Sequence, residues 1–160
     1  MVKIFAAKTD KELELVRALL EEYVDWMVSE ELISEQELGA FKEQLVNLPN
    51  GFAPPNGCLL VGMYRGEAAG CVALRDLSDG ICEMKRLFVT PEFRGLGIGR
   101  ALAEAVIGKA RKIGYSQMRV HTLRAMETAN LLYSAMGFKE IGPYEENIIE
   151  GAVFMELKLV

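Results

Sequence analysis

The feature that most constrains this chain is a glycine-rich turn between a predicted strand and a predicted helix. Gly95, Gly97 and Gly99 follow an apolar stretch that ends at Val89, and apolar residues at helical spacing then continue to a stop at Gly114. Glycines let successive backbone N–H groups turn toward one point, and a helix N-terminus adds unsatisfied donors and partial positive charge. This order of elements indicates a site for a phosphate group.

Two common nucleotide-binding patterns do not fit the turn. A Walker A loop ends in Gly-Lys-Ser/Thr, whereas Gly99 is followed by Arg100 and Ala101, so no hydroxyl is offered for magnesium. The dinucleotide fingerprint would need a glycine at the position of Arg100 and an acidic residue about 20 positions later, which Arg119 to His121 do not supply. The turn therefore favours another phosphate-bearing ligand, and its alternative is a tight loop that binds nothing.

The charge distribution supports a small anionic ligand rather than nucleic acid. The chain has 160 residues and a net charge of -5. Between Glu83 and Arg124, nine basic residues stand against three acidic ones, which gives +6 for this segment and leaves -11 for the remainder. A mainly acidic chain repels nucleic acid, while the basic segment around the turn attracts a phosphorylated small molecule.

Length and composition predict one globular domain over residues 1–160. With 51% hydrophobic and 26% charged residues, the chain has no apolar run near the roughly 20 residues that span a bilayer. The N-terminal segment does not resemble a signal peptide, so we expect a cytoplasmic protein without a membrane partner. Cys58, Cys71 and Cys82 form no C-x-x-C pair, and with His121 as the one histidine the sequence offers no metal site.

The order of predicted elements indicates an α/β fold. Thr9 with Glu12 and Ser34 with Glu37 are capping-box pairs that open two helices. Three strands joined by tight turns follow, and such strands are antiparallel. After the glycine turn and its helix come a strand, a helix and two last strands, so we predict a mixed, mostly antiparallel central sheet with helices on both faces. The strands are expected at residues 2–6, 58–64, 68–75, 81–89, 117–122, 138–141 and 153–159.

Two segments resemble signature motifs of the GNAT acetyltransferases. Residues 83–99, EMKRLFVTPEFRGLGIG, look like strand 4 and the pyrophosphate loop of that superfamily, whose pattern is Arg/Gln-x-x-Gly-x-Gly/Ala. Residues 129–138, ANLLYSAMGF, resemble its later A-x-x-L-Y-x-x-x-G-F signature. The resemblance implies a GNAT-like fold and an N-acetyltransferase with acetyl-CoA as cosubstrate. The acetyl group would pass to a primary amine by direct attack in a ternary complex.

The resemblance also implies where acetyl-CoA binds. A V-shaped gap would separate the strand ending at Val89 from the next strand, and the pantetheine arm would lie in it like an extra strand. The backbone amides from Arg94 to Arg100 would hold the pyrophosphate. An asparagine often stands where this chain has Met126, and Asn130 occupies a usually apolar position. The implied cofactor-binding residues are Leu87, Phe88, Val89, Arg94, Gly95, Leu96, Gly97, Ile98, Gly99, Arg100 and Met126.

Two side chains are candidate catalytic groups. The resemblance makes Tyr133 the general acid, because a phenol with a pKa of about 10 is protonated at neutral pH and can donate to a departing thiolate. Its helical spacing with Leu132 and Met136, taken alone, favours a core position instead. Glu83 is either the base that removes the proton of the amine, directly or through a water, or a strand-end glutamate paired with Lys85, Arg86 or Lys112.

The acceptor side of the site is less well specified. Tyr144 is expected to contact the acceptor, while His121 could act as a base but fits a structural position better. Tyr23 and Trp26 are expected to be core aromatics of the first helix. The acidic remainder of the chain favours a cationic amine, on a small molecule or a peptide, and a homodimer is left open. A non-catalytic acyl-CoA binding or sensing module, or a nucleotide-binding protein, are the alternative functions.

Overall fold

The computed structural model describes residues 1–146 and 148–160, and its centre is a seven-stranded sheet. The strand order is β1-β2-β3-β4-β5-β7-β6, and β4 with β5 is the one parallel pair among the described strands. The predicted mixed, mostly antiparallel sheet is therefore confirmed. The strands are β1 (Lys3–Ala6), β2 (Cys58–Tyr64), β3 (Glu67–Ser78), β4 (Ile81–Val89), β5 (Gln117–Leu123), β6 (Lys139–Ile141) and β7 (Ala152–Lys158).

Four α-helices are described: α1 (Asp10–Ser29), α2 (Glu35–Val46), α3 (Ile98–Ile113) and α4 (Glu127–Ala135). Both predicted capping boxes are present, because the N–H of Glu12 donates to Thr9 Oγ1 at 3.1 Å and that of Glu37 to Ser34 Oγ at 3.2 Å. A 3₁₀ turn, η1 (Pro91–Phe93), lies between β4 and the glycine-rich turn. Among the described residues, no helix is both long and apolar enough to cross a membrane.

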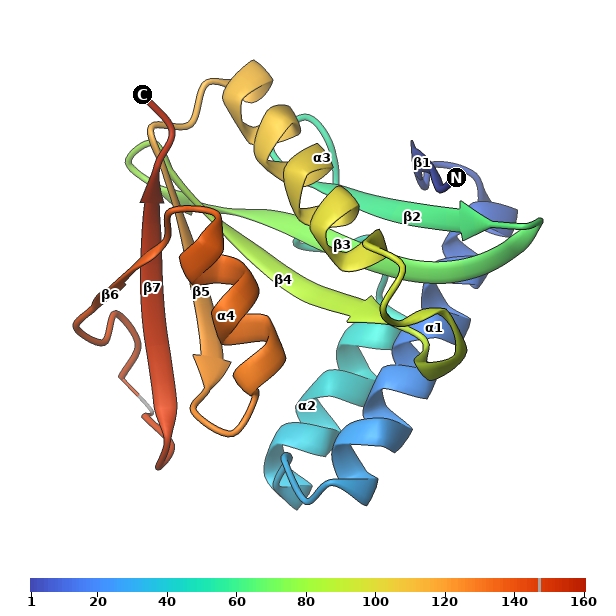
Figure 1. Ribbon diagram of the computed structural model, residues 1–160, viewed down its shortest axis with the longest axis horizontal. Coiled ribbons are helices and arrows are strands. Elements are labelled where there is room, and N and C mark those ends of the chain that lie inside the picture. Colours follow the sequence, from blue (N-terminus) through green and yellow to red (C-terminus); the bar gives the residue numbers. More distant parts are fainter. Residues whose placement is uncertain (147) are drawn as a thin grey trace.

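The helices cover both faces of the sheet (Figure 1). Helices α3 and α4 pack with one set of strand side chains, which includes Leu60, Val72 and Met84. Helices α1 and α2 pack with the alternate set, which includes Val61 and Phe88. Because successive side chains of a strand point to opposite faces, the central strands supply apolar groups to two cores. This agrees with the predicted arrangement of helices on both faces.

The parallel pairing between β4 and β5 is short. It joins Ile81, Cys82 and Glu83 to the segment Gln117–Arg119, and beyond Glu83 the two strands separate. Figure 1 shows β4 running toward α1 and α2 while β5 stays beside β7. The sheet therefore opens into a V at its centre, as the family resemblance implies.

A β-bulge lies on the open side of this V. The register of β4 against β3 passes from Lys85 opposite Ala73 to Phe88 opposite Cys71, so two residues of β4 face one of β3. Arg86, at the bulge, has a φ of 60°. A bulge bends its strand and increases the local twist, so β4 leans away from β5 at this point.

Candidate functional site

The glycine-rich turn exposes the N-terminus of α3. Gly95 and Gly97 both have a φ of 80°, a conformation that side chains with a β-carbon rarely adopt, and Gly97 is the N-cap of the helix. Within the described structure, no side chain of the N-cap residue bonds the first N–H groups of α3, and these groups have no partner inside the helix. These donors and the positive end of the helix dipole suit an anion such as a diphosphate.

A groove of about 700 Å³ runs from this turn along the end of β4 to the start of α4. We call it the large groove. Arg94 stands at its side, where Nε donates to the carbonyl of Val89 at 3.0 Å and the guanidinium lies 5.1 Å from the ring centre of Trp26. With unpaired donors at one end and apolar strand residues along its length, the groove fits a long ligand with an anionic centre. Its principal lining residues are Leu87, Phe88, Val89, Phe93, Arg94, Gly95, Gly97, Ile98, Gly99, Arg100, Met126, Ala129 and Leu132.

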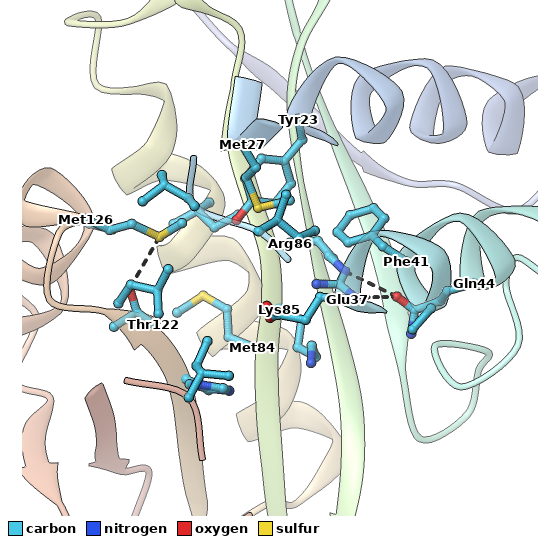
Figure 2. Close-up of a pocket in the computed structure, with 18 of the residues that line it drawn as sticks. Tyr23, Met27, Glu37, Phe41, Gln44, Met84, Lys85, Arg86, Thr122 and Met126 are labelled. Carbon is cyan, nitrogen blue, oxygen red and sulfur yellow. Dashed lines mark hydrogen bonds between the residues drawn. The ribbon is translucent and has the colours of Figure 1, made fainter. Parts of the chain in front are cut away.

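A second space of about 350 Å³, the small cavity, lies in the opening between β4 and β5. The large groove and the small cavity meet at five residues that line both spaces: Tyr23, Leu32, Leu87, Met126 and Ala129. Figure 2 shows that side chains from α1, α2, β4 and β5 converge on the small cavity. A ligand in the groove and a second molecule in the cavity would therefore be neighbours.

Tyr133 of α4 lines the small cavity. Its side chain is buried, and burial raises the pKa of its phenol. The ring also packs against Phe138, 5.5 Å away between ring centres. The position thus combines the two roles that the sequence offered, because the residue belongs to the core and also faces the cavity.

Glu83 is fully buried beside the start of the V, and both of its carboxylate oxygens are bound. Arg75 Nε donates to Oε1 at 2.7 Å, with Lys85 Nζ 3.7 Å from the same atom, and the Tyr144 hydroxyl donates to Oε2 at 2.5 Å. Burial raises the pKa of Tyr144, and the charge of Glu83 raises it further. Glu83 and Tyr144 are not among the described residues that line the small cavity. A base at Glu83 would therefore need a relay through one of its partners.

His121 of β5 lines the small cavity. Its Nδ1 lies 3.3 Å from Glu145 Oε2, and its ring stacks on Phe154 with 4.6 Å between centres. The contact with Glu145 fixes the orientation of the ring on the cavity wall. His121 therefore has the structural role expected from the sequence and also forms part of the cavity wall.

The family model for the acetyltransferase (GNAT) family matches residues 16–138. The chain belongs to this family. It is an acetyl-CoA-dependent N-acyltransferase, and its GNAT fold carries both the large groove and the small cavity.

Two relatives in sequence and one solved structure illustrate the range of likeness. An N-acetyltransferase of Schizosaccharomyces pombe, described as uncharacterised, is 36% identical over 160 residues, which cover 99% of this chain and 95% of that protein. An N-acetylaspartate synthetase of Xenopus tropicalis is 34% identical over 98 residues, 61% of this chain and 36% of its own length. The PaiA N-acetyltransferase of Thermoplasma acidophilum, solved with coenzyme A, superposes with a TM-score of 0.78 at 20% identity and covers 99% of both chains.

The GNAT residues expected to bind the cofactor gather on the large groove, with one exception. Leu96 is 53% exposed and is not among the described residues that line it. Arg100 is at the groove, but its Nε is paired with Glu104 at 3.0 Å, so its backbone is better placed than its side chain for a ligand. Their role as cofactor contacts remains a prediction.

Several residues of the GNAT site were missed or assigned to other roles by sequence reasoning. Tyr23 and Trp26 pack against the core as expected, and both also line the large groove, because α1 crosses the end of β4. Asn130 donates to the carbonyl of Leu123 at 2.9 Å and so ties α4 to the end of β5. Arg86 and Gln44 of the small cavity carry no sequence signal, since they come from separate elements that only the fold brings together.

Proposed function

We propose that the protein transfers an acetyl group from acetyl-CoA to a primary amine by direct attack, with both substrates bound at once. The single observation that carries this proposal is the meeting of the large groove and the small cavity where β4 and β5 separate. Two adjoining spaces allow the two reactants to be held side by side, which removes the entropic cost of bringing them together.

Acetyl-CoA supplies the activated thioester in this proposal. The N–H groups at the start of α3 would bind its pyrophosphate, and the unpaired amides of β4 beyond Glu83 would bind its amide-containing arm. The same amides can donate to a carbonyl oxygen on which negative charge develops. The positive φ of Gly95 and Gly97, which shapes the turn before the helix, supports this placement.

Tyr133 would protonate the departing thiolate. Its place on the small cavity and the raised pKa of its buried phenol support this role, because the group stays protonated over the whole physiological pH range. Removing the hydroxyl would leave the ring and its packing against Phe138 in place.

The proton of the attacking amine needs an acceptor, since an ammonium group has no free electron pair. His121 lines the cavity and is oriented by Glu145, so it is the nearer candidate. Glu83 would act through Tyr144 or Lys85, both of which contact it. A loss of the acidic limb of the rate profile in His121→Gln, with the limb retained in Glu83→Gln, would assign the role to His121.

A covalent acyl-cysteine is not part of the proposal. Cys58, Cys71 and Cys82 are buried, and none is among the described residues that line the groove or the cavity. Burial raises the pKa of Cys71 and of Cys82 to about 12, so both thiols remain protonated and poorly nucleophilic.

The test is thiol release from acetyl-CoA in the presence of amino acids, polyamines, aminoglycosides and short peptides. We expect release that depends on the amine and initial-rate lines that intersect when both substrates are varied. Parallel lines would contradict direct transfer and indicate an acylated enzyme. Tight binding of acetyl-CoA without turnover of any amine would support a binding or sensing module instead.

A further inference from the structure

Arg86 is held at the wall of the small cavity by the bulge of β4. Its positive φ and the doubled residue at the bulge turn the side chain toward α2, where it meets Phe41 and Gln44. Figure 2 shows the guanidinium beside the Phe41 ring, with dashed lines to Gln44. The guanidinium carbon lies 3.9 Å from the centre of that ring. A bulge that re-aims a side chain at a cavity is typical of a functional position.

The other charged groups of the small cavity already have partners. Lys85 lies 3.7 Å from Glu83, and Glu145 lies 3.3 Å from His121. Glu37 accepts the N–H of Ser34 at 3.1 Å in its capping box. Neither Glu37 nor Glu145, the two carboxylates that line the cavity among the described residues, forms an ion pair with Arg86.

Arg86 lacks a counter-ion in the described part of the chain. It takes part in none of the ion pairs found there, and its polar side-chain partner is the neutral amide oxygen of Gln44, at 3.2 Å from Nε and 2.5 Å from Nη2. Burial lowers the pKa of Arg86, which reflects the cost of keeping its charge away from water. A partly buried guanidinium that is not neutralised is unfavourable unless a ligand supplies the negative charge.

The guanidinium still has donors to offer. It carries five N–H groups, of which Gln44 takes two, so three remain for an anion. A planar guanidinium fits a carboxylate with two parallel hydrogen bonds. The guanidinium carbon lies over the Phe41 ring, so an approaching anion has to bind on a side of the group that Phe41 and Gln44 leave free.

The position of Arg86 argues against the cofactor as the source of that anion. Arg86 lines the small cavity and is not among the described residues of the large groove, whose anion-binding donors lie at the start of α3. The two positive centres therefore serve different spaces. The unneutralised guanidinium of Arg86 is therefore available to bind the molecule that occupies the small cavity.

We propose that Arg86 binds a carboxylate of the acceptor, so that the substrate is a small amino acid, a primary amine that also carries a carboxylate. This rests on the acetyl transfer proposed above and adds the substrate class. The carboxylate would be held at Arg86 on the α2 side, and the amine would lie toward the junction with the large groove. A cavity of about 350 Å³ suits a molecule of this size.

The experiment compares matched acceptors and two variants of the site. The acceptors are α-, β- and γ-amino acids, the carboxamide of each, and the amine that lacks the carboxyl group. We expect kcat/KM for the best amino acid to exceed that of its carboxamide by about 10- to 100-fold, the worth of a hydrogen bond to a charged group. Acetyl-CoA binding, followed separately by thermal shift, should not depend on the acceptor.

Gln44→Glu is the sharper variant, because it places a carboxylate of nearly the same shape on the guanidinium. The new ion pair should remove the preference for the amino acid over its carboxamide, while the thermal shift produced by acetyl-CoA, which is assigned to the large groove, stays unchanged. Arg86→Met should do the same by removing the charge. Arg17→Met is the matched control, since Arg17 Nε also ties its element to α2, through the carbonyl of Leu45 at 3.0 Å, but does not line the cavity.

The outcomes separate the two proposals. A preference for carboxylates that is lost in Gln44→Glu and Arg86→Met but kept in Arg17→Met supports the assignment. Equal rates for amino acids and carboxamides, or a preference that survives both variants, overturn it and leave the acetyltransferase proposal standing. Absence of turnover with every amine, despite bound acetyl-CoA, overturns the proposed function and the assignment that rests on it.

Discussion

The large groove and the small cavity are built in different ways. Backbone groups dominate the anion-binding end of the groove, where one continuous segment from β4 to α3 supplies the donors. Side chains dominate the cavity, and they come from α1, α2, β4, β5, α4 and the segment between β6 and β7. A local backbone site serves a ligand common to a whole family, while a site assembled from distant side chains can change its acceptor one residue at a time.

The largest expected effect concerns the junction of the two spaces. Tyr133→Phe should lower kcat by about 100-fold or more, because a general acid contributes on this scale, while the affinity for acetyl-CoA stays unchanged. Thiol release and thermal shift measure the two quantities. Tyr115→Phe is the control, since the Tyr115 hydroxyl donates to the carbonyl of Asn56 away from both spaces. Equal activity of the two variants would refute the acid role.

The next effect tests whether the groove depends on backbone shape. Gly97→Ala should raise KM for acetyl-CoA about 10-fold, because a β-carbon strains the turn and disturbs N–H groups that would bind a charged ligand. Gly114→Ala is a matched control at the other end of α3. It has a φ of 110° and, like Gly97, has open space where a β-carbon would stand. Both variants should lose similar stability, so a rise in KM shared by both would argue against a special role for Gly97.

A smaller effect, at high pH, concerns the contact between β3 and the backbone of β4 at Arg86. Cys71 Sγ donates to the carbonyl of Arg86 at 3.5 Å, and burial raises the pKa of this thiol to about 12. The unfolded thiol ionises near pH 9 and the folded one does not, so the free energy of unfolding should fall as the pH rises from 9 toward 12. One such group contributes a slope of about 1 kcal/mol per pH unit.

Urea unfolding at pH 8, 9 and 10 measures this slope. Cys71→Ala lowers the stability at every pH but should make the decline shallower than in the parent chain. Identical slopes would mean that the Cys71 thiol ionises equally easily in both states. Cys58→Ala provides a comparison, since burial raises the pKa of Cys58 to about 11 and its removal should change the slope in the same direction.

The smallest effect concerns the link between β5 and α4. Asn130→Leu removes the hydrogen bond to the Leu123 carbonyl, but it also removes the Asn130 Oδ1 atom, which is buried without a partner among the described residues. These contributions oppose each other, so the free energy of unfolding should change by less than about 1 kcal/mol. Thermal unfolding would show this, and a loss of several kcal/mol would mean that the carbonyl bond matters far more than assumed.

The large groove and the small cavity also differ in how far they could be predicted from the sequence. The sheet, the capped helices and the glycine turn follow from local patterns of spacing and capping, and they are present in the structure. Ala129 to Phe138 marked Tyr133 for the same reason, since the motif is continuous. Local patterns therefore indicated the groove and the junction.

The cavity could not be predicted in this way. Of the partners expected for Glu83, Lys85 is present, but the closer partner Arg75 was not foreseen, because only the pairing of β3 with β4 brings Arg75 opposite Glu83. Gln44 and Arg86 are 42 positions apart and meet through the packing of α2 against the sheet. Contacts of this kind depend on the tertiary structure, and no short pattern reports them.

The three-residue ladder between β4 and β5 has a further consequence for the protein without ligands. Beyond Glu83 the facing sides of both strands lack a partner strand and amount to sheet edges inside the molecule, although the carbonyls of Val89 and Leu123 accept hydrogen bonds from Arg94 and Asn130. Such edges invite pairing with another chain, so concentrated ligand-free protein should self-associate more readily than protein saturated with coenzyme A. The amide protons of Leu87 and Val89 should likewise exchange rapidly until a bound arm covers them.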